Sequence, residues 1–125
     1  MATELQLAKT KFMFNEDRVD IQLFDTIIVS IARSSATNYL VTLATGGYDT
    51  VMTYQRIQNI IRVFQLGLAI TRRADLHYWY VEGSVNTGYP LYTQKMDPLS
   101  TDTYSFYVPQ RLSIEDMKKI YTDSL

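Results

Sequence analysis

The chain has 125 residues, of which 46% are hydrophobic and 20% are charged, with only 5 glycines and 3 prolines. This size and composition predict one globular domain with a single core, and they exclude a disordered tail. The formal net charge of −1 argues against a protein that binds nucleic acid over its whole surface. The absence of cysteine excludes a disulfide framework, a thiolate nucleophile and a sulfur-ligated zinc site, and it favours an intracellular protein.

No targeting or membrane segment is visible in the sequence. Residues 1–7 lack a basic stretch followed by an apolar one, and no apolar run is long enough to span a bilayer. No internal repeat or linker divides the chain, so residues 1–125 are predicted to form a single domain. We therefore expect a cytoplasmic or virion protein that is not secreted through a signal peptide and that has no membrane role.

The first third of the chain is β-like. Residues 19–23 alternate apolar and polar side chains, as expected of a strand with one wet face, and residues 25–26 follow as a turn. Residues 27–31 and 39–43 are rich in β-branched and large apolar side chains. They flank a polar stretch at 33–38, which predicts a hairpin.

The middle of the chain carries the predicted long helix. Asp49 and Thr50 are candidate N-caps, since either side chain accepts a hydrogen bond from the free amides of a helix that begins near Val51. Large apolar residues then recur at steps of three and four: Tyr54, Ile57, Ile61, Phe64 and Leu68. Residues 65–71 also alternate like a strand, so the helix is expected to stop near Gly67.

The second half returns to strands and closes with a helix. Aromatic strands are predicted at 76–81 and 103–108, with a short strand at 91–93 between two turns. Residues 113–116 resemble a capping box with Asp in place of Glu or Gln, which marks the start of the last helix. This order predicts an α+β fold, in which an antiparallel sheet carries one central amphipathic helix and one C-terminal helix packed on one face.

The candidate catalytic residue is His77, the single histidine, because its ordinary pKa lies nearest neutrality. It falls in an aromatic strand, and no Gly-x-Ser-x-Gly pattern is present. Neither a phosphate-binding loop nor a dinucleotide fingerprint occurs, and the carboxylates lack the spacing of a calcium loop. We predict a noncatalytic protein with no metal, no cofactor and no indicated small-molecule substrate; a small enzyme that uses His77 is the least favoured alternative.

The segment from Arg33 to Arg73 holds five arginines and one aspartate, so it carries a net charge of +4. Arginine clusters hold phosphates bidentately, and neighbouring aromatic rings offer stacking faces for unpaired bases. These features predict a nucleic-acid site, with RNA as the candidate ligand, made of Arg56, Arg62, Arg72, Arg73, Tyr78 and Trp79. The open alternative is that the arginines pair with the acidic ends of the chain while the aromatic rings fill the core.

Tyrosine is frequent in the chain, with ten copies beside five phenylalanines and one tryptophan. A small core does not hide ten tyrosines, and tyrosine suits interfaces because its ring buries well while its hydroxyl finds a partner. The candidate interface residues are Tyr89, Tyr92, Tyr104 and Tyr107. The edges of aromatic strands also pair readily, so we predict that the protein self-associates into a homo-oligomer.

Residues 27–43 resemble the central hairpin of single-stranded RNA phage coat proteins. The stretch from Tyr104 to Lys119 is similar to the late strand and the Ser/Thr-acidic helix start of that family. The resemblance covers about a third of the chain and implies a dimeric shell subunit with RNA on its sheet. The predicted helix at 50–65 departs from the family, in which strands are expected there, and so does the ending after one C-terminal helix.

The leading interpretation is a noncatalytic, self-associating structural protein, such as a viral capsid or assembly subunit that contacts RNA. The alternative is a monomeric regulatory module that binds a nucleic acid or a protein through the same arginines and aromatic rings. The mass of the protein in solution separates these two interpretations.

Overall fold

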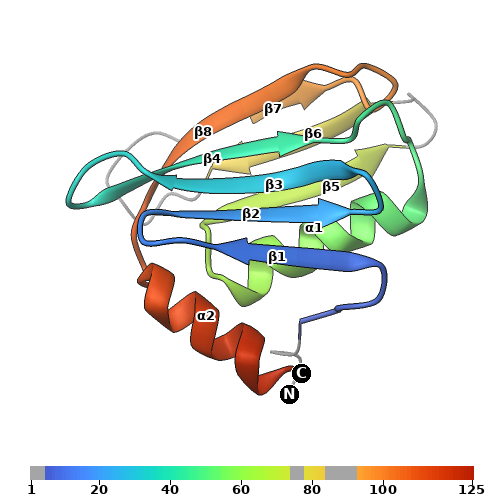
Figure 1. Ribbon diagram of the computed structural model, residues 1–125. Helices are drawn as coiled ribbons and strands as arrows, with labels where there is room; N and C mark the ends of the chain where they lie inside the picture. Colours follow the sequence, from blue (N-terminus) through green and yellow to red (C-terminus); the bar gives the residue numbers. More distant parts are fainter. Residues whose placement is uncertain (1–4, 74–77, 84–92) are drawn as a thin grey trace.

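The computed structural model describes residues 5–73, 78–83 and 93–125, and in that part of the chain it is an α+β protein made mostly of antiparallel sheet (Figure 1). The predicted fold class, with one central and one C-terminal helix, is confirmed. In chain order the elements are β1 (Thr10–Phe14), β2 (Arg18–Leu23), β3 (Thr26–Arg33), β4 (Asn38–Ala44), α1 (Val51–Val63), β5 (Leu68–Arg73), β6 (Tyr78–Gly83), β7 (Thr93–Met96), β8 (Thr103–Pro109) and α2 (Ile114–Asp123).

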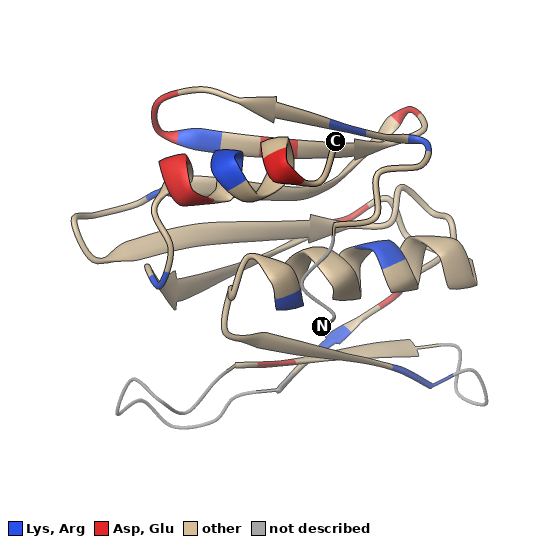
Figure 2. Ribbon diagram, turned by 90° about the horizontal axis from the view of Figure 1, so that it is seen from below, with Lys and Arg blue, Asp and Glu red and all other residues tan. Residues whose placement is uncertain are grey.

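The described strands divide into two sheets, a division that the sequence patterns did not predict. The larger sheet has the strand order β1-β2-β3-β4-β8, and the smaller one has the order β5-β6-β7. Helix α1 contacts β3 of the larger sheet and β5 of the smaller sheet. Seen from below, α1 lies as a layer between the two sheets (Figure 2). The larger sheet therefore has an inner face toward α1 and an outer face toward the viewer of Figure 1.

The predicted hairpin at 27–43 is the centre of the larger sheet. Its strands β3 and β4 pair with Val29 opposite Leu43 and Ile31 opposite Val41, and all four side chains are fully buried. Opposite residues of an antiparallel pair share a face, so these two rows form the inner face of the sheet. The predicted strand at 19–23 is confirmed as β2, which extends the same buried face.

Helix α1 begins as expected and ends earlier. The side chain of Thr50 accepts a hydrogen bond from the amide of Thr53 at 3.1 Å, which makes Thr50 the N-cap. The helix ends at Val63, four residues before the predicted stop at Gly67. Gln65 and Gly67 both adopt positive φ and turn the chain into β5, so the strand-like alternation at 65–71 is realised in that strand.

The predicted capping box of α2 is confirmed. Ser113 Oγ accepts from the Asp116 amide at 3.0 Å, and Asp116 Oδ2 accepts from the Ser113 amide at 3.2 Å. The ring of Tyr121 packs on Phe12 and Phe14 of β1, with centroid distances of 4.9 and 5.4 Å. Strand β1, which no sequence pattern had singled out, is thus fixed by long-range packing of α2.

Candidate functional site

Arg56 is buried, with 7% of its surface exposed. Its Nη1 donates to Oε1 of Gln6 at 3.1 Å, and its Nη2 donates to the carbonyl of Ala8 at 3.0 Å. Its Nε has no hydrogen-bond partner, and burial lowers the pKa of the guanidinium. Arg56 therefore anchors the N-terminal segment on α1, which corrects its predicted place on a phosphate-binding surface.

Trp79 and Arg72 share one acceptor, the partly buried carboxylate of Asp49. The indole Nε1 of the fully buried Trp79 donates to Oδ1 of Asp49 at 3.3 Å, and Arg72 Nε lies 3.4 Å from the same oxygen. Trp79 also makes an edge-on contact with the ring of Tyr54. The ring of Trp79 is therefore not available to stack on a base, which corrects its predicted place in the nucleic-acid site. Asp49, considered as an N-cap, instead ties β5 and β6 to the loop before α1.

The remaining predicted basic residues do not form one cluster. Arg62 is exposed in the last turn of α1, whereas Arg72 is tied to Asp49 beside the first turn. Arg62 and the Arg72–Asp49 pair therefore lie near opposite ends of α1, a helix of 13 residues that is about 20 Å long. Arg73 is exposed on β5. The structure thus divides the predicted arginine cluster among the interior, the end of α1 and the smaller sheet.

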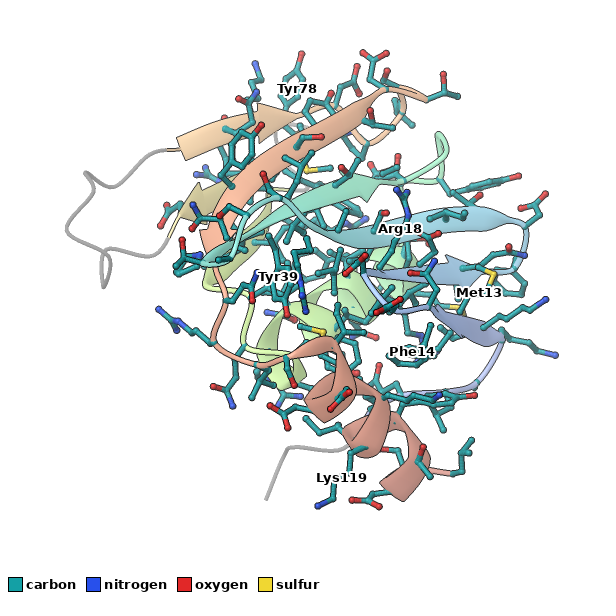
Figure 3. All side chains as sticks on the ribbon, turned by 60° about the vertical axis from the view of Figure 1, so that its left-hand side comes forward. Met13, Phe14, Arg18, Tyr39, Tyr78 and Lys119 are labelled. Atoms are coloured by element: carbon teal, nitrogen blue, oxygen red, sulfur yellow. The ribbon has the colours of Figure 1, made fainter. Side chains whose placement is uncertain are left out.

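The side of the smaller sheet turned away from α1 carries a basic and aromatic surface, which we call the tyrosine face. Strand pairing places Arg73 opposite Tyr78, and Thr71 opposite Tyr80, which in turn faces Lys95. The Nζ of Lys95 lies 3.5 Å from the ring centroid of Tyr78, a cation–π contact. Figure 3 shows Tyr78 at the margin of the molecule, in contrast to Tyr39 within it. Of the predicted nucleic-acid residues, Arg73 and Tyr78 therefore do lie together.

The predicted interface tyrosines have different positions. Tyr107 is 68% exposed on the outer face of β8. Tyr104 is half-buried, and its hydroxyl accepts a hydrogen bond from the amide of Asp97 at 3.1 Å. Tyr89 and Tyr92 lie outside the described residues, as does His77.

The exposed apolar surface gathers elsewhere, at one end of the larger sheet. The structure has eight exposed large hydrophobic side chains in its described part, and six of them belong to adjoining loops, to the start of β3 and to the first turn of α1. We call this surface the apolar end; it consists of Phe24, Ile27, Tyr48, Val51, Met52 and Leu99. In Figure 1 it lies where the β2–β3 turn, the β4–α1 loop and the β7–β8 loop meet. Apolar surface gathered in this way marks an interaction site more often than scattered single residues do.

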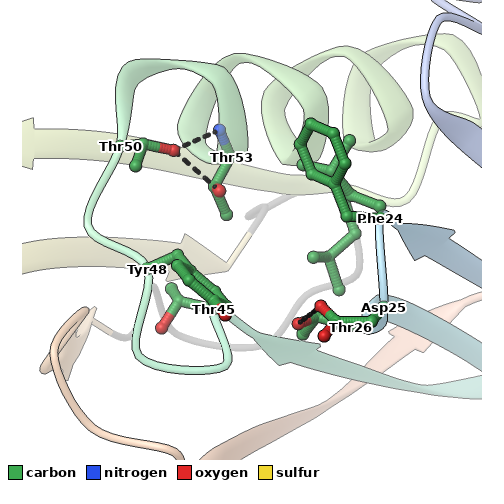
Figure 4. A pocket seen from close by; sticks show the side chains of 9 residues that line it. Phe24, Asp25, Thr26, Thr45, Tyr48, Thr50 and Thr53 are labelled. Atoms are coloured by element: carbon green, nitrogen blue, oxygen red, sulfur yellow. Dashed lines mark hydrogen bonds between the residues drawn. The ribbon is translucent and has the colours of Figure 1, made fainter.

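A cavity of about 210 Å³ opens at the apolar end. The rings of Phe24 and Tyr48 stand on opposite sides of its mouth (Figure 4). The lining combines an apolar floor, four threonines and one charged side chain: Leu23, Phe24, Asp25, Thr26, Ile28, Thr45, Tyr48, Thr50 and Thr53.

The loop that forms one wall of this cavity is fixed by hydrogen bonds. Thr45 Oγ1 donates to the carbonyl of Pro98 at 2.8 Å and accepts from the amide of Gly47 at 3.1 Å. Gly46 has a φ of +64°, and a Cβ at this position would lie 2.7 Å from two side-chain atoms of Thr26. The loop therefore approaches the start of β3 so closely that a Cβ at Gly46 would require Thr26 to shift.

The sequence analysis missed the apolar end, although one local signal was present. The two turn residues between β2 and β3 are Phe24 and Asp25, and Phe24 has positive φ, a position at which Asn or Gly is usual in such turns. A phenylalanine in that position is a departure that a search for turn residues would have found.

No group of metal-ligating side chains occurs among residues 5–73, 78–83 and 93–125. Neither described helix combines the length and the apolar character needed to cross a bilayer. Comparisons of this chain with protein-family models, with curated proteins and with solved structures found no match.

Proposed function

We propose that the protein is a noncatalytic, self-associating structural subunit whose copies meet at the apolar end. The observation that supports this proposal is the concentration on one surface of six of the eight large hydrophobic side chains that are exposed in the described part of the chain. Six half-exposed side chains of this size leave on the order of 600 Å² of apolar surface in water, the upper limit of the patches usual on monomers. A stable interface buries about 800 Å² per partner, so this patch is large enough to form its core. The resemblance to phage coat proteins suggests a virus shell as the assembly.

The test places negative charge on the apolar end without weakening the fold. Val51 and Met52 are exposed in the first turn of α1, which contains no acidic residue. Carboxylates are favourable at a helix N-terminus, so V51E/M52E should fold at least as well as the wild type. Two buried charges would nevertheless oppose contact between copies.

Light scattering after size exclusion measures the mass of each variant. We expect a wild-type mass at a multiple of 14.5 kDa and a mass near 14.5 kDa for V51E/M52E. The matched control S34E/T37E puts the same charge in the exposed β3–β4 loop and should keep the wild-type mass. A monomeric wild type, or an unchanged mass for V51E/M52E, would contradict the proposal.

A second candidate function, contact with single-stranded RNA, is favoured by the tyrosine face. Tyr78 and Tyr80 lie two residues apart on the central strand of the smaller sheet, and Arg73 and Lys95 flank them on the neighbouring strands. Aromatic rings that stack on successive bases, beside cations that neutralise phosphates, are the usual means of binding a single strand. This surface replaces the set predicted from sequence: it keeps Arg73 and Tyr78, adds Tyr80 and Lys95, and omits Arg56, Arg62, Arg72 and Trp79.

Fluorescence anisotropy with a labelled oligouridine tests this candidate. Y78A/Y80A should weaken binding by at least tenfold, since each stacked base contributes about 1–3 kcal/mol. R73Q/K95Q should instead reduce the salt dependence of the affinity. The control Y107A removes an exposed tyrosine from the other sheet and should bind like the wild type. Equal affinities for Y78A/Y80A and Y107A would exclude the tyrosine face.

A further inference from the structure

Phe24 occupies a left-handed turn position at which Asn or Gly is usual, and the packing of its ring does not account for a phenylalanine there. Its φ is +53°, in the left-handed region that a bulky residue rarely adopts. Its ring is 60% exposed, so core packing does not offset the strain. A strained residue whose ring packs little and lines a cavity points to a functional requirement for that ring.

Hydrogen bonds fix the backbone of Phe24, which carries its ring at the mouth of the cavity. The Phe24 amide donates to the carbonyl of Lys9 at 3.1 Å, and Nε2 of Gln22 donates to the Phe24 carbonyl at 2.8 Å. Across the mouth, the loop that carries Tyr48 is fixed by Thr45 and by the close approach of Gly46 to Thr26. The backbone segments that carry the two rings are thus fixed, which lowers the entropy lost when a ligand binds between the rings.

The negative charge of Asp25 at the mouth of the cavity favours a positively charged ligand. Asp25 is the one charged side chain in the lining, and its Oδ1 has only a 3.4 Å hydrogen bond from Thr26 Oγ1 among the described residues. No lysine or arginine is among the described residues that line the cavity. A carboxylate beside two aromatic faces attracts an organic cation, because the ring quadrupole and the carboxylate both favour positive charge.

The lining and the volume of the cavity favour a small apolar group in its interior. Leu23 and Ile28 form the floor, and the hydroxyls of Thr50 and Thr53 are already hydrogen-bonded to each other at 2.9 Å. The volume of about 210 Å³ lies below the 300–1,000 Å³ of sites for drug-sized ligands. It therefore suits a group of about one ring.

We propose that this cavity binds a small amphipathic organic cation, with an apolar body on the floor and an ammonium group beside Asp25 between Phe24 and Tyr48. This ligand site goes beyond the proposed self-association, because a concave site for a small molecule requires no second copy. The two are linked where both hold: a bound ligand alters the surface at which the copies meet.

Isothermal titration calorimetry with two matched probes tests the site. 2-Phenylethylamine carries a ring and an ammonium, and 3-phenylpropionate carries the same ring with a carboxylate. We expect saturable binding of the amine and at least tenfold weaker binding of the carboxylate. D25N should weaken the binding of the amine at least tenfold, and asparagine has the shape of aspartate and is also a usual turn residue, so the fold should be retained. The control D17N removes a carboxylate from the opposite end of the sheet and should bind the amine like the wild type.

The outcomes separate this proposal from self-association when the mass is measured on the same samples. Absence of amine binding to an oligomeric or a monomeric wild type overturns the ligand site alone. Equal binding of the two probes, or an unchanged affinity in D25N, does so as well. Saturable, Asp25-dependent binding to a wild type that stays at 14.5 kDa supports the ligand site and contradicts the self-association.

Discussion

The two ends of strand β3 differ in how their turns are built. At one end the β3–β4 loop, Ser34 to Thr37, lies beside the β1–β2 turn, Asn15 to Asp17; we call these residues the polar end. At the other end the β2–β3 turn belongs to the apolar end. Both ends connect antiparallel strands of the same sheet, so they reverse the chain direction in a similar way but with different residues.

At the polar end, side chains satisfy the backbone of the turn. Ser35 Oγ accepts from the amides of Thr37 and Asn38 at 3.2 and 3.1 Å. Nε2 of Gln110 donates to the Ser35 carbonyl at 2.9 Å. Serine and asparagine are the residues that turn chemistry favours, so the sequence and the local structure agree here.

At the apolar end, the residues oppose the preferences of the turn. Phe24 occupies a left-handed position, and the rings of Phe24 and Tyr48 are 60% and 54% exposed. The comparison separates a turn whose residues follow local preferences from one whose residues depart from them, and the second is the turn at which we propose a ligand site. Substitutions at the two ends should therefore change the free energy of unfolding by different amounts and, for some, in opposite directions.

The largest effect is expected for G46A at the apolar end. The alanine Cβ would lie 2.7 Å from Thr26 Cγ2 and Oγ1 at a φ of +64°, so we expect a loss of about 3 kcal/mol in the free energy of unfolding. G47A has a similar φ of +87°, but its nearest neighbour is 3.5 Å away, so it should lose only about 1 kcal/mol. Denaturant titration gives both values. Equal losses of stability in G46A and G47A would show that the contact between residue 46 and Thr26 is not tight. Adding T26A to G46A should recover part of the lost stability.

The next largest effect is expected for Y39F, near the polar end. The hydroxyl of the buried Tyr39 donates to the carbonyl of Leu112 at 2.7 Å and thereby joins β4 to the start of α2. Removing it leaves a carbonyl without this donor and should lower the free energy of unfolding by about 1–2 kcal/mol. Denaturant titration at neutral pH measures the change, and a loss below 0.5 kcal/mol, the usual range of surface substitutions, would contradict it.

Tyr39 also predicts a dependence on pH. Desolvation by burial raises the pKa of its phenol; Arg33 lowers it and Asp116 raises it by smaller amounts. The phenol of the unfolded chain therefore ionises first, near its ordinary pKa of about 10. The stabilisation is complete below that pH and is lost as the pH rises through the higher pKa of the folded state. Denaturant titrations at a series of pH values between 8 and 11 should show that the free energy of unfolding falls more steeply with pH for the wild type than for Y39F. Parallel curves for the two proteins would contradict this.

A smaller loss is expected for S35A at the polar end. This substitution removes the acceptor of two backbone amides and should cost about 1 kcal/mol, as for a lost helix cap. S34A is the matched control, because the neighbouring Ser34 is equally exposed and its hydroxyl has no hydrogen bond in the described structure. Thermal unfolding of both variants compares them, and an effect of S34A as large as that of S35A would remove the assigned role of Ser35.

The sequence predicted those parts of the fold that depend on near neighbours. The hairpin at 27–43 follows from β-branched runs around a polar loop, and the caps at Thr50 and Ser113 follow from side chains within three residues of the amides that they bind. The division into two sheets was not predicted, because alternation along a strand does not say which strand is its neighbour.

The candidate sites were harder to predict, because they depend on distant packing. Arg56 looked solvent-facing by helical periodicity, yet the N-terminal segment, about fifty residues away in sequence, covers that side of α1. Trp79 was assigned to a surface, but the loop before α1 supplies the acceptor that allows its indole to be buried. The cavity at the apolar end joins two loops that only the pairing of β3 with β4 brings together.

The smallest effect, and the one that most directly tests the comparison, is expected for F24N. Asparagine tolerates the left-handed backbone, so this change should raise the free energy of unfolding by about 0.5–1 kcal/mol, in contrast to the loss in S35A. The same change removes one ring from the apolar end, so F24N should also lower the affinity for 2-phenylethylamine and weaken self-association. Denaturant titration, calorimetry and light scattering on one preparation measure all three. A loss of stability in F24N would mean that the ring packs as a structural element, and the contrast between the two ends of β3 would then carry no functional meaning.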